Sequence, residues 1–80
     1  LRGITMNTDT ELDAKGLSCP MPIVKLAQQV KAMNAGEVVR LIADDPGSKE
    51  DVPAWCRRTG NELLESTTEG SDFIFYIKKA

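Results

Sequence analysis

Histidine is absent from the sequence, and cysteine occurs only twice, at Cys19 and Cys56, in 80 residues. Catalysis by histidine and zinc sites built from histidine and cysteine are therefore excluded within one copy of the chain. Two widely separated cysteines do not form a Cys-x-x-Cys metal-binding pair, and a structural disulfide is not expected in a cytoplasmic protein. The available chemistry is that of thiols, carboxylates, amines and backbone dipoles, and we expect no metal and no resident cofactor.

Positive charge and long apolar runs are also scarce. Lysine and arginine contribute 10 charges against 12 from aspartate and glutamate, which gives a formal net charge of −2. This balance lacks the basic excess that drives binding to a phosphate backbone, so we expect no direct nucleic-acid partner. The apolar runs are far shorter than the ~20 residues of a membrane span, and no secretory signal is visible. We therefore expect a cytoplasmic protein that does not bind membranes.

A chain of 80 residues predicts a single small domain with one core and one shallow site. Residues 1–10 are predicted to be a disordered N-terminal stub. Within it, residues 1–5 precede Met6 and are interpreted as a possible vector remnant. Residues 11–79 contain no repeat, low-complexity tract or linker, so we expect them to form the domain.

Hydrophobic periodicity predicts four strands and two helices. Alternating or β-branched residues predict strands at 10–14, 37–43, 61–68 and 73–78. Apolar residues at 3- and 4-residue steps predict a helix from Pro20 to about Met33. A second helix is predicted at 48–59, with one face formed by Val52, Trp55, Cys56 and Thr59. Ser48 is expected to cap it together with Asp51, although Pro53 allows a start shifted to Asp51.

The order β-α-β-α-β-β predicts an α/β two-layer sandwich, with two helices on one face of a four-stranded mixed sheet. The right-handed crossover rule makes the first two strands parallel. The loops that follow these strands then lie at the same edge of the sheet. We therefore expect Cys19 and the pair Asp44-Asp45 to be neighbours, where open α/β sheets usually place their sites.

The unusual stretch Cys19-Pro20-Met21-Pro22 carries the candidate chemistry. Proline is favoured at the first position of a helix, so Cys19 is expected at the N-cap or next to it. Free N–H groups and the positive end of the helix stabilise a thiolate there, and nearby carboxylates oppose it. The residues alone leave the net direction of the pKa shift open. They also leave open the alternative that Cys19 is an inert buried thiol.

Other polar and apolar features have simpler interpretations. Cys56 lies on an apolar helix face and is expected to be structural. Asp44-Asp45 before Pro-Gly is interpreted as a solvated turn rather than a cation site, and Arg57-Arg58 as solvated charges at a helix end. Opposite the helices, the sheet face is expected to leave three side chains partly exposed as a partner surface, namely Ile42, Ile74 and Tyr76.

The segment from Leu12 to Pro22 resembles the signature of the TusA/SirA-like sulfur carrier protein family, in which Gly-Leu precedes Cys-Pro-x-Pro. The resemblance continues through a series of later positions, namely Gly36-Glu37, Asp44-Asp45-Pro46, Asp51-Val52-Pro53, Cys56 and Gly60. It covers nearly everything from Leu12 to Lys79. It implies a fold similar to the C-terminal domain of bacterial translation initiation factor three.

The resemblance also implies that Cys19 accepts sulfane sulfur as a persulfide, which is transient cargo rather than a cofactor. The implied donor is a cysteine desulfurase or a rhodanese, and the implied acceptor is a protein with a reactive cysteine. Family destinations include tRNA thiolation, molybdenum-cofactor assembly and sulfur oxidation. A sulfurtransferase-type relay by a monomer, rather than a stand-alone enzyme, is expected. Supporting motif residues are Gly16, Leu17, Pro20 and Pro22, and roles in tuning or docking are assigned to Asp45 and Lys25.

Two other functions remain open from the sequence. One is a non-catalytic protein-binding or regulatory module that uses the exposed sheet face. The other is an RNA-binding module, suggested by the fold alone, against which the negative net charge argues.

Overall fold

The computed structural model describes residues 8–80, and its elements follow the predicted order. The strands are β1 (Thr10–Asp13), β2 (Val38–Ala43), β3 (Glu62–Glu69) and β4 (Asp72–Lys78). The helices are α1 (Met21–Lys31) and α2 (Ser48–Thr59). The predicted range of the second helix is confirmed. The first helix ends earlier than predicted, and Met33 packs in the core just beyond it.

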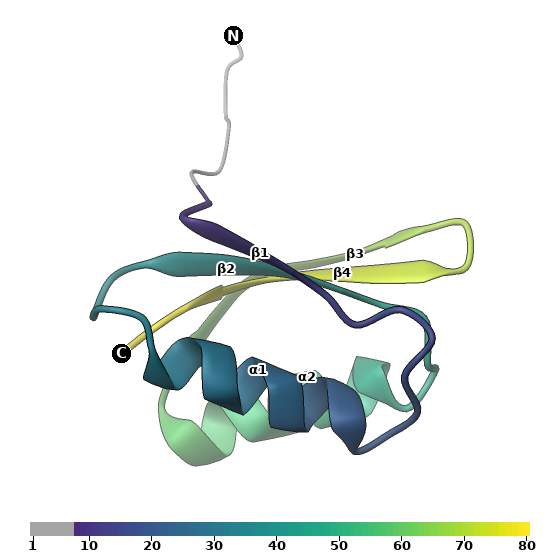
Figure 1. The fold of residues 1–80 in the computed structure, drawn as a ribbon, viewed down its shortest axis with the longest axis horizontal. Helices are drawn as coiled ribbons and strands as arrows, with labels where there is room; N and C mark the ends of the chain where they lie inside the picture. Colours follow the sequence, from purple (N-terminus) through teal and green to yellow (C-terminus); the bar gives the residue numbers. More distant parts are fainter. Residues whose placement is uncertain (1–7) are drawn as a thin grey trace, which may run out of the picture.

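The four strands form one mixed sheet in the order β1-β2-β4-β3. The pair β1 and β2 is parallel, as predicted, whereas β4 runs antiparallel to both β2 and β3. Both helices lie on the same side of the sheet (Figure 1). The predicted α/β two-layer sandwich is therefore confirmed.

The chain is attached to the sheet just before β1. The backbone N–H of Asp9 donates to the carbonyl of Val38 at 2.8 Å, and its carboxylate accepts the N–H of Val38 at 2.8 Å. Thr10 already belongs to β1. Ordered structure thus begins before the expected domain boundary at residue 11. The rest of the predicted stub, including residues 1–5, lies outside the described residues.

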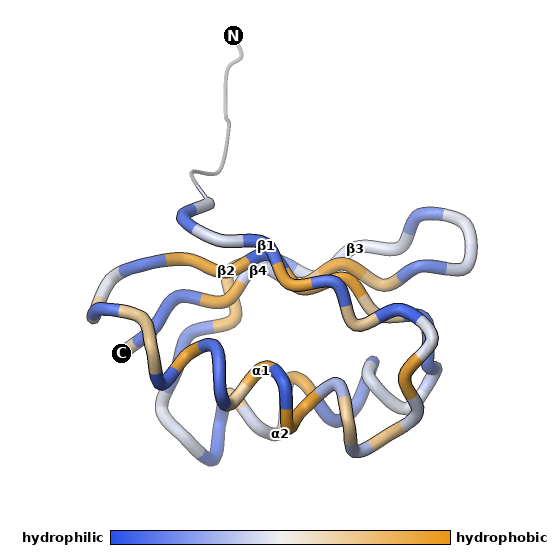
Figure 2. The backbone as a smooth tube through the Cα atoms, in the orientation of Figure 1, coloured by the Kyte–Doolittle hydropathy of each residue, from blue (hydrophilic) through white to orange (hydrophobic). Residues whose placement is uncertain are grey.

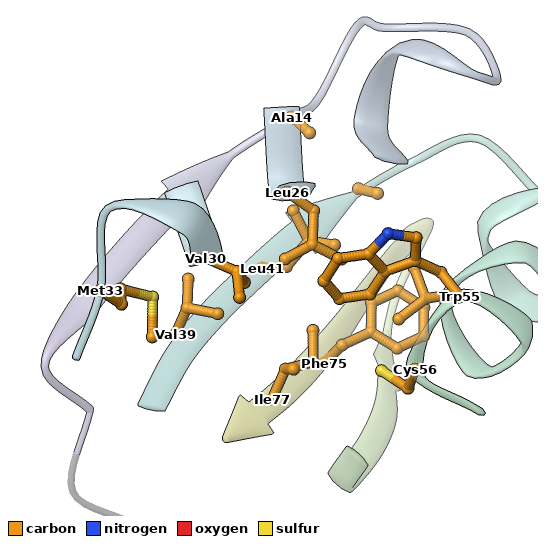
Figure 3. Close-up of a cluster of buried hydrophobic side chains, with 12 residues drawn as sticks. Ala14, Leu26, Val30, Met33, Val39, Leu41, Trp55, Cys56, Phe75 and Ile77 are labelled. Carbon is orange, nitrogen blue, oxygen red and sulfur yellow. The ribbon is translucent and has the colours of Figure 1, made fainter. Parts of the chain in front are cut away.

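The core fills the space between the helices and the sheet. Both layers contain hydrophobic stretches (Figure 2), and buried side chains from the two layers meet between them (Figure 3). Leu26 of α1, Leu41 of β2 and Phe75 of β4 are fully buried, and Trp55 of α2 packs in the same cluster. Burial of a side chain of this size contributes about 1.5–3 kcal/mol relative to its exposure. This core fixes the position of α1, and thereby of the segment that precedes it.

The prediction for the opposite sheet face is correct for two residues and wrong for one. Ile42 and Tyr76 are half-buried, but Ile74 is only 2% exposed. Ile74 lies between its strand neighbours Ile42 and Thr67 in the middle of the sheet. On the same face the guanidinium of Arg40 donates to the Tyr76 hydroxyl at 3.2 Å. Polar contacts thus occupy part of the surface that was expected to be apolar.

The start of α2 also differs from the prediction. Its N-cap is Gly47, and no side chain donates or accepts a capping hydrogen bond there. Ser48 is the first helical residue and is 1% exposed, so the predicted Ser48–Asp51 capping box does not form. Pro53 lies within the helix, which begins before it. At the other end Gly60 adopts the left-handed conformation with φ of 80°, as expected of a C-terminal glycine.

Candidate functional site

The loops after β1 and β2 meet at one edge of the sheet, as predicted from the parallel pairing of these strands. The N–H of Gly16 donates to both carboxylate oxygens of Asp44, at 3.0 and 3.2 Å. The N–H of Cys19 donates to Oδ2 of Asp45 at 3.3 Å. The predicted proximity of Cys19 to Asp44-Asp45 is confirmed. These two carboxylates hold the loop that carries the thiol.

Cys19 is exposed and lies one residue before the N-cap of α1, which is Pro20. The peptide bond between these residues is cis. Pro22, in the first turn of the helix, is buried and anchors the segment to the core side. The alternative of a buried Cys19 is therefore wrong. Cys19 thus lies at the surface, next to a helix turn that Pro22 ties to the core.

The first turn of α1 has no free N–H group for an anionic sulfur. Pro20 and Pro22 have none, and the N–H of Met21 donates to the carbonyl of Ser18 at 2.9 Å. The N–H groups of Ile23 and Val24 both donate to the carbonyl of Pro20, at 3.0 Å. Direct stabilisation of a thiolate by these donors, one element of the prediction, is absent from this conformation.

The thiol instead meets the first turn of the other helix. Cys19 Sγ donates a hydrogen bond to Oδ2 of Asp51, which lies in that turn of α2. Gly47, the N-cap of α2, lies beside this contact. A Cβ atom added there would come within 3.6 Å of Cys19 Cβ and within 2.9 Å of Oδ2 of Asp45. The absence of a side chain at position 47 leaves room for both carboxylates around Cys19.

The surrounding carboxylates raise the pKa of the Cys19 thiol above its ordinary value. The largest cause is the hydrogen bond to Asp51, followed by desolvation and by the negative charges of Asp51 and Asp45. Each of these effects favours the neutral thiol over the thiolate. The direction that the sequence left open is therefore upward.

A shallow groove of about 240 Å³ lies next to the thiol. It runs between the start of α1 and one face of α2, and its lining residues are Pro20, Ile23, Asp51, Ala54 and Arg58. Asp51 both lines the groove and contacts Cys19. The groove and the thiol are therefore joined through Asp51.

The remaining predicted site residues are spread around this arrangement. Leu17 is partly buried and packs against the core, and Gly16 binds Asp44. Lys25 is exposed on α1, and no ion pair of Lys25 is found within residues 8–80. Cys56 is 3% exposed, and burial raises the pKa of its thiol, which agrees with the structural role predicted for it.

Sequence reasoning missed Asp51 and Gly47 as parts of the site. From the sequence, Asp51 is interpreted as a helix-capping residue and as one position of the family resemblance, with no role at the site. A usable signal was present, because the first turn of the second predicted helix follows the Asp44-Asp45 turn directly. Its acidic residues therefore lie near the same sheet edge as Cys19.

Neither a metal-binding group of side chains nor a membrane-spanning helix is found within the described part of the chain. No three side chains of the types His, Cys, Asp and Glu are grouped so that they could hold a metal ion. No helix there has the length and apolar character needed to cross a membrane.

The sequence of this chain is similar to those of known proteins. The family model described as "Sulfurtransferase TusA" matches residues 10–79. The chain is 51% identical over 72 residues to "Sulfur carrier protein TusA" of Allochromatium vinosum, covering 90% of this chain and 95% of the relative. It is 43% identical over 74 residues to "Putative sulfur carrier protein YrkI" of Bacillus subtilis, covering 92% and 99%.

A solved structure also has this fold. The crystal structure of a SirA-like protein from Desulfitobacterium hafniense superposes with a TM-score of 0.75, at 21% sequence identity. The match covers 86% of this chain and 95% of that protein.

Proposed function

The chain belongs to the TusA family, and on that premise we propose that it is a sulfur carrier whose Cys19 takes up and passes on sulfane sulfur. The observation that supports this most directly is the position of Cys19. It is the exposed one of the two cysteines, and it lies at a sheet edge beside an open groove. Cys56 is buried in the core and has no comparable access.

The proposed reaction exchanges sulfur between two thiols. Cys19 attacks the outer sulfur of a donor persulfide, a bond forms between the two sulfur atoms, and the sulfur–sulfur bond of the donor breaks. The products are the persulfide of Cys19 and the free thiol of the donor. The acceptor then receives the sulfur by the same exchange in the opposite direction. The transferred sulfur does not change its oxidation state, so neither step needs an external oxidant or reductant.

The implied partners are two proteins that meet the same thiol in turn. A cysteine desulfurase or a rhodanese is proposed as the donor, and a protein with a reactive cysteine as the acceptor. Thiolation of tRNA, molybdenum-cofactor assembly or sulfur oxidation is the proposed destination. The exposed thiol and the open groove support a relay of this kind, because a deeply enclosed site would exclude a second protein.

The competing module that binds through the sheet face is less well supported. Ile74 was one of its three expected contact residues and is buried, and Tyr76 binds Arg40. The apolar area open to a partner is thus smaller than the sequence indicated.

Intact-protein mass spectrometry tests the proposed function. The protein is incubated with a cysteine desulfurase, pyridoxal phosphate and cysteine, and parallel samples contain Cys19→Ser and Cys56→Ser. We expect a reducible gain of about 32 Da, one sulfur atom, in the wild type and in Cys56→Ser. Cys19→Ser should show none. If neither this donor nor thiosulfate with a rhodanese gives the gain in the wild type, the carrier function is refuted.

A further inference from the structure

The Cys19 thiol has a defined hydrogen-bond acceptor, and the exchange reaction must remove the proton that this bond holds. The thiol is exposed, yet its Sγ donates to Oδ2 of Asp51 rather than facing solvent alone. The thiolate is the nucleophilic form of cysteine. The proton therefore has to leave Sγ before or during the attack on a donor persulfide.

Carboxylates are the groups in contact with Cys19 that can take this proton, and the first turn of α1 offers no free N–H group to stabilise the anion. The sequence has no histidine. The first-turn N–H groups of α1 are missing at Pro20 and Pro22, and at Met21, Ile23 and Val24 they donate to backbone carbonyls. Asp45 accepts the backbone N–H of Cys19, so its Oδ2 is already engaged near the thiol. Asp51 is the carboxylate that contacts the sulfur itself.

We propose that Asp51 is the catalytic base of the sulfur exchange: it accepts the Sγ proton as Cys19 attacks and returns that proton to the sulfur that leaves. Such a role exists only if Cys19 carries sulfur, so it rests on the proposed function. Atoms and protons are conserved in this exchange. Cys19 loses a proton and gains one sulfur atom, which ends as the outer S–H of its persulfide, and the donor becomes a thiol with the proton from Asp51.

The position of Asp51 suits both halves of this proton transfer. It lies in the first turn of α2 and accepts the hydrogen bond from Cys19 Sγ, so it is in direct contact with the proton that must leave. It also lines the groove next to Cys19, so a donor that enters the groove lies beside the same carboxylate. General bases contribute typically about 100-fold or more to a rate when they are in hydrogen-bond contact with the proton.

A simpler role for Asp51 makes the opposite prediction and can be separated from this one. The hydrogen bond and charge of Asp51 raise the pKa of the Cys19 thiol. If Asp51 did nothing else, its removal would supply more thiolate at neutral pH and would speed every reaction of Cys19. A base role instead predicts that sulfur transfer slows while reactions that need only a preformed thiolate become faster.

The experiment therefore measures two reactions of the full chain as a function of pH. One is alkylation of Cys19 by iodoacetamide, which reports the thiolate. The other is the initial rate of the 32 Da gain from glutathione persulfide (one sulfur atom, about 32 Da), a small donor that removes protein docking from the comparison. The variant is Asp51→Asn. The matched control is Glu50→Gln, which removes the same charge from an exposed residue in the same turn of α2.

For Asp51→Asn we expect faster alkylation at pH 7, with the profile shifted to lower pH, and sulfur transfer slowed by about 100-fold. Asp51→Glu, which keeps a carboxylate, should recover part of the transfer rate. Glu50→Gln should match the wild type in both reactions. Thermal denaturation of each variant checks that the fold is intact.

Two results would overturn the inference while the carrier function stands. One is transfer by Asp51→Asn as fast as by the wild type or faster. The other is an equal loss of transfer in Glu50→Gln, which would assign the effect to net charge. Absence of any sulfur gain in the wild type from glutathione persulfide, from the desulfurase and from thiosulfate with a rhodanese would instead refute the proposed function itself.

Discussion

Replacement of Leu26 by alanine tests whether α1 is packed as described, and thus whether Cys19 is held by the core. Leu26 is fully buried at the centre of α1, between the helix and the sheet. Its truncation removes apolar contacts and leaves a cavity, at a cost of about 2–5 kcal/mol. A domain of 80 residues has a free energy of unfolding of about 4–12 kcal/mol in total. We therefore expect a loss of about 3 kcal/mol, a large part of the whole.

The assay is urea denaturation followed by the fluorescence of Trp55, the single tryptophan, which is 6% exposed. The slope of the free energy of unfolding against urea concentration should be the same in Leu26→Ala and in the wild type, because both expose the same surface when they unfold. In a separate thermal denaturation, the midpoint temperature of Leu26→Ala should lie roughly 12–24 °C below that of the wild type for a domain of this size. Val24→Ala is the control on the same helix. Val24 is 39% exposed, so its truncation should change stability by less than about 0.5 kcal/mol.

Cys56 provides an independent measure of the same loss. Its buried thiol reacts with iodoacetamide only when the surrounding structure opens, whereas Cys19 reacts in the folded state. A loss of about 3 kcal/mol corresponds to roughly 100-fold faster labelling of Cys56 when opening is global. The rate at Cys19 should stay the same. A cost below about 1 kcal/mol for Leu26→Ala, or an equal cost for Val24→Ala, would refute this packing.

Further predictions concern pH, a helix end and the thiol itself. Burial raises the pKa of Cys56, so the folded state keeps its proton where the unfolded chain has lost it, and the free energy of unfolding should fall as the pH rises above about 8.5. In Cys56→Ala this fall of the free energy of unfolding with pH should disappear. If urea denaturation at several pH values shows the same fall in Cys56→Ala as in the wild type, the prediction is contradicted. Gly60→Ala places a side chain at a φ of 80° and should cost about 1 kcal/mol in the same denaturation assay, whereas no cost would show that α2 ends differently. The midpoint of Cys19 alkylation against pH should lie above that of an unstructured cysteine peptide, because Asp51 and Asp45 favour the thiol; a midpoint below the peptide's would show that these contacts are absent in solution.

Local patterns in the sequence were sufficient for the architecture. The alternation in residues 73–78 and the 3- and 4-residue steps after Pro20 identify β4 and α1, because side-chain periodicity follows directly from backbone geometry. Gly60 marks the end of α2 for a similarly local reason, its left-handed conformation. The parallel pairing of β1 and β2 follows from the handedness of the helical connection. From that pairing the sequence also placed Cys19 beside Asp44-Asp45.

The details that the sequence did not determine all depend on contacts between segments that are distant along the chain. The sequence predicts Ile74 to be partly exposed on its strand, and its neighbours in the sheet are what bury it. Ser48 reads as a helix cap, yet the packing of α2 buries it and leaves Gly47 at the cap position.

The pKa of Cys19 shows the same division. The motif around Cys19 determines that a thiol precedes a proline-started helix, and from this alone a lowered pKa is as reasonable as a raised one. The direction depends on which charges lie within hydrogen-bond reach. Tertiary structure brings Asp51, which is 32 residues further along the chain, into contact with Sγ. The sequence thus singled out the Cys19 thiol as the candidate, and the tertiary structure decided where its proton is held, because electrostatic interactions depend on distance in space.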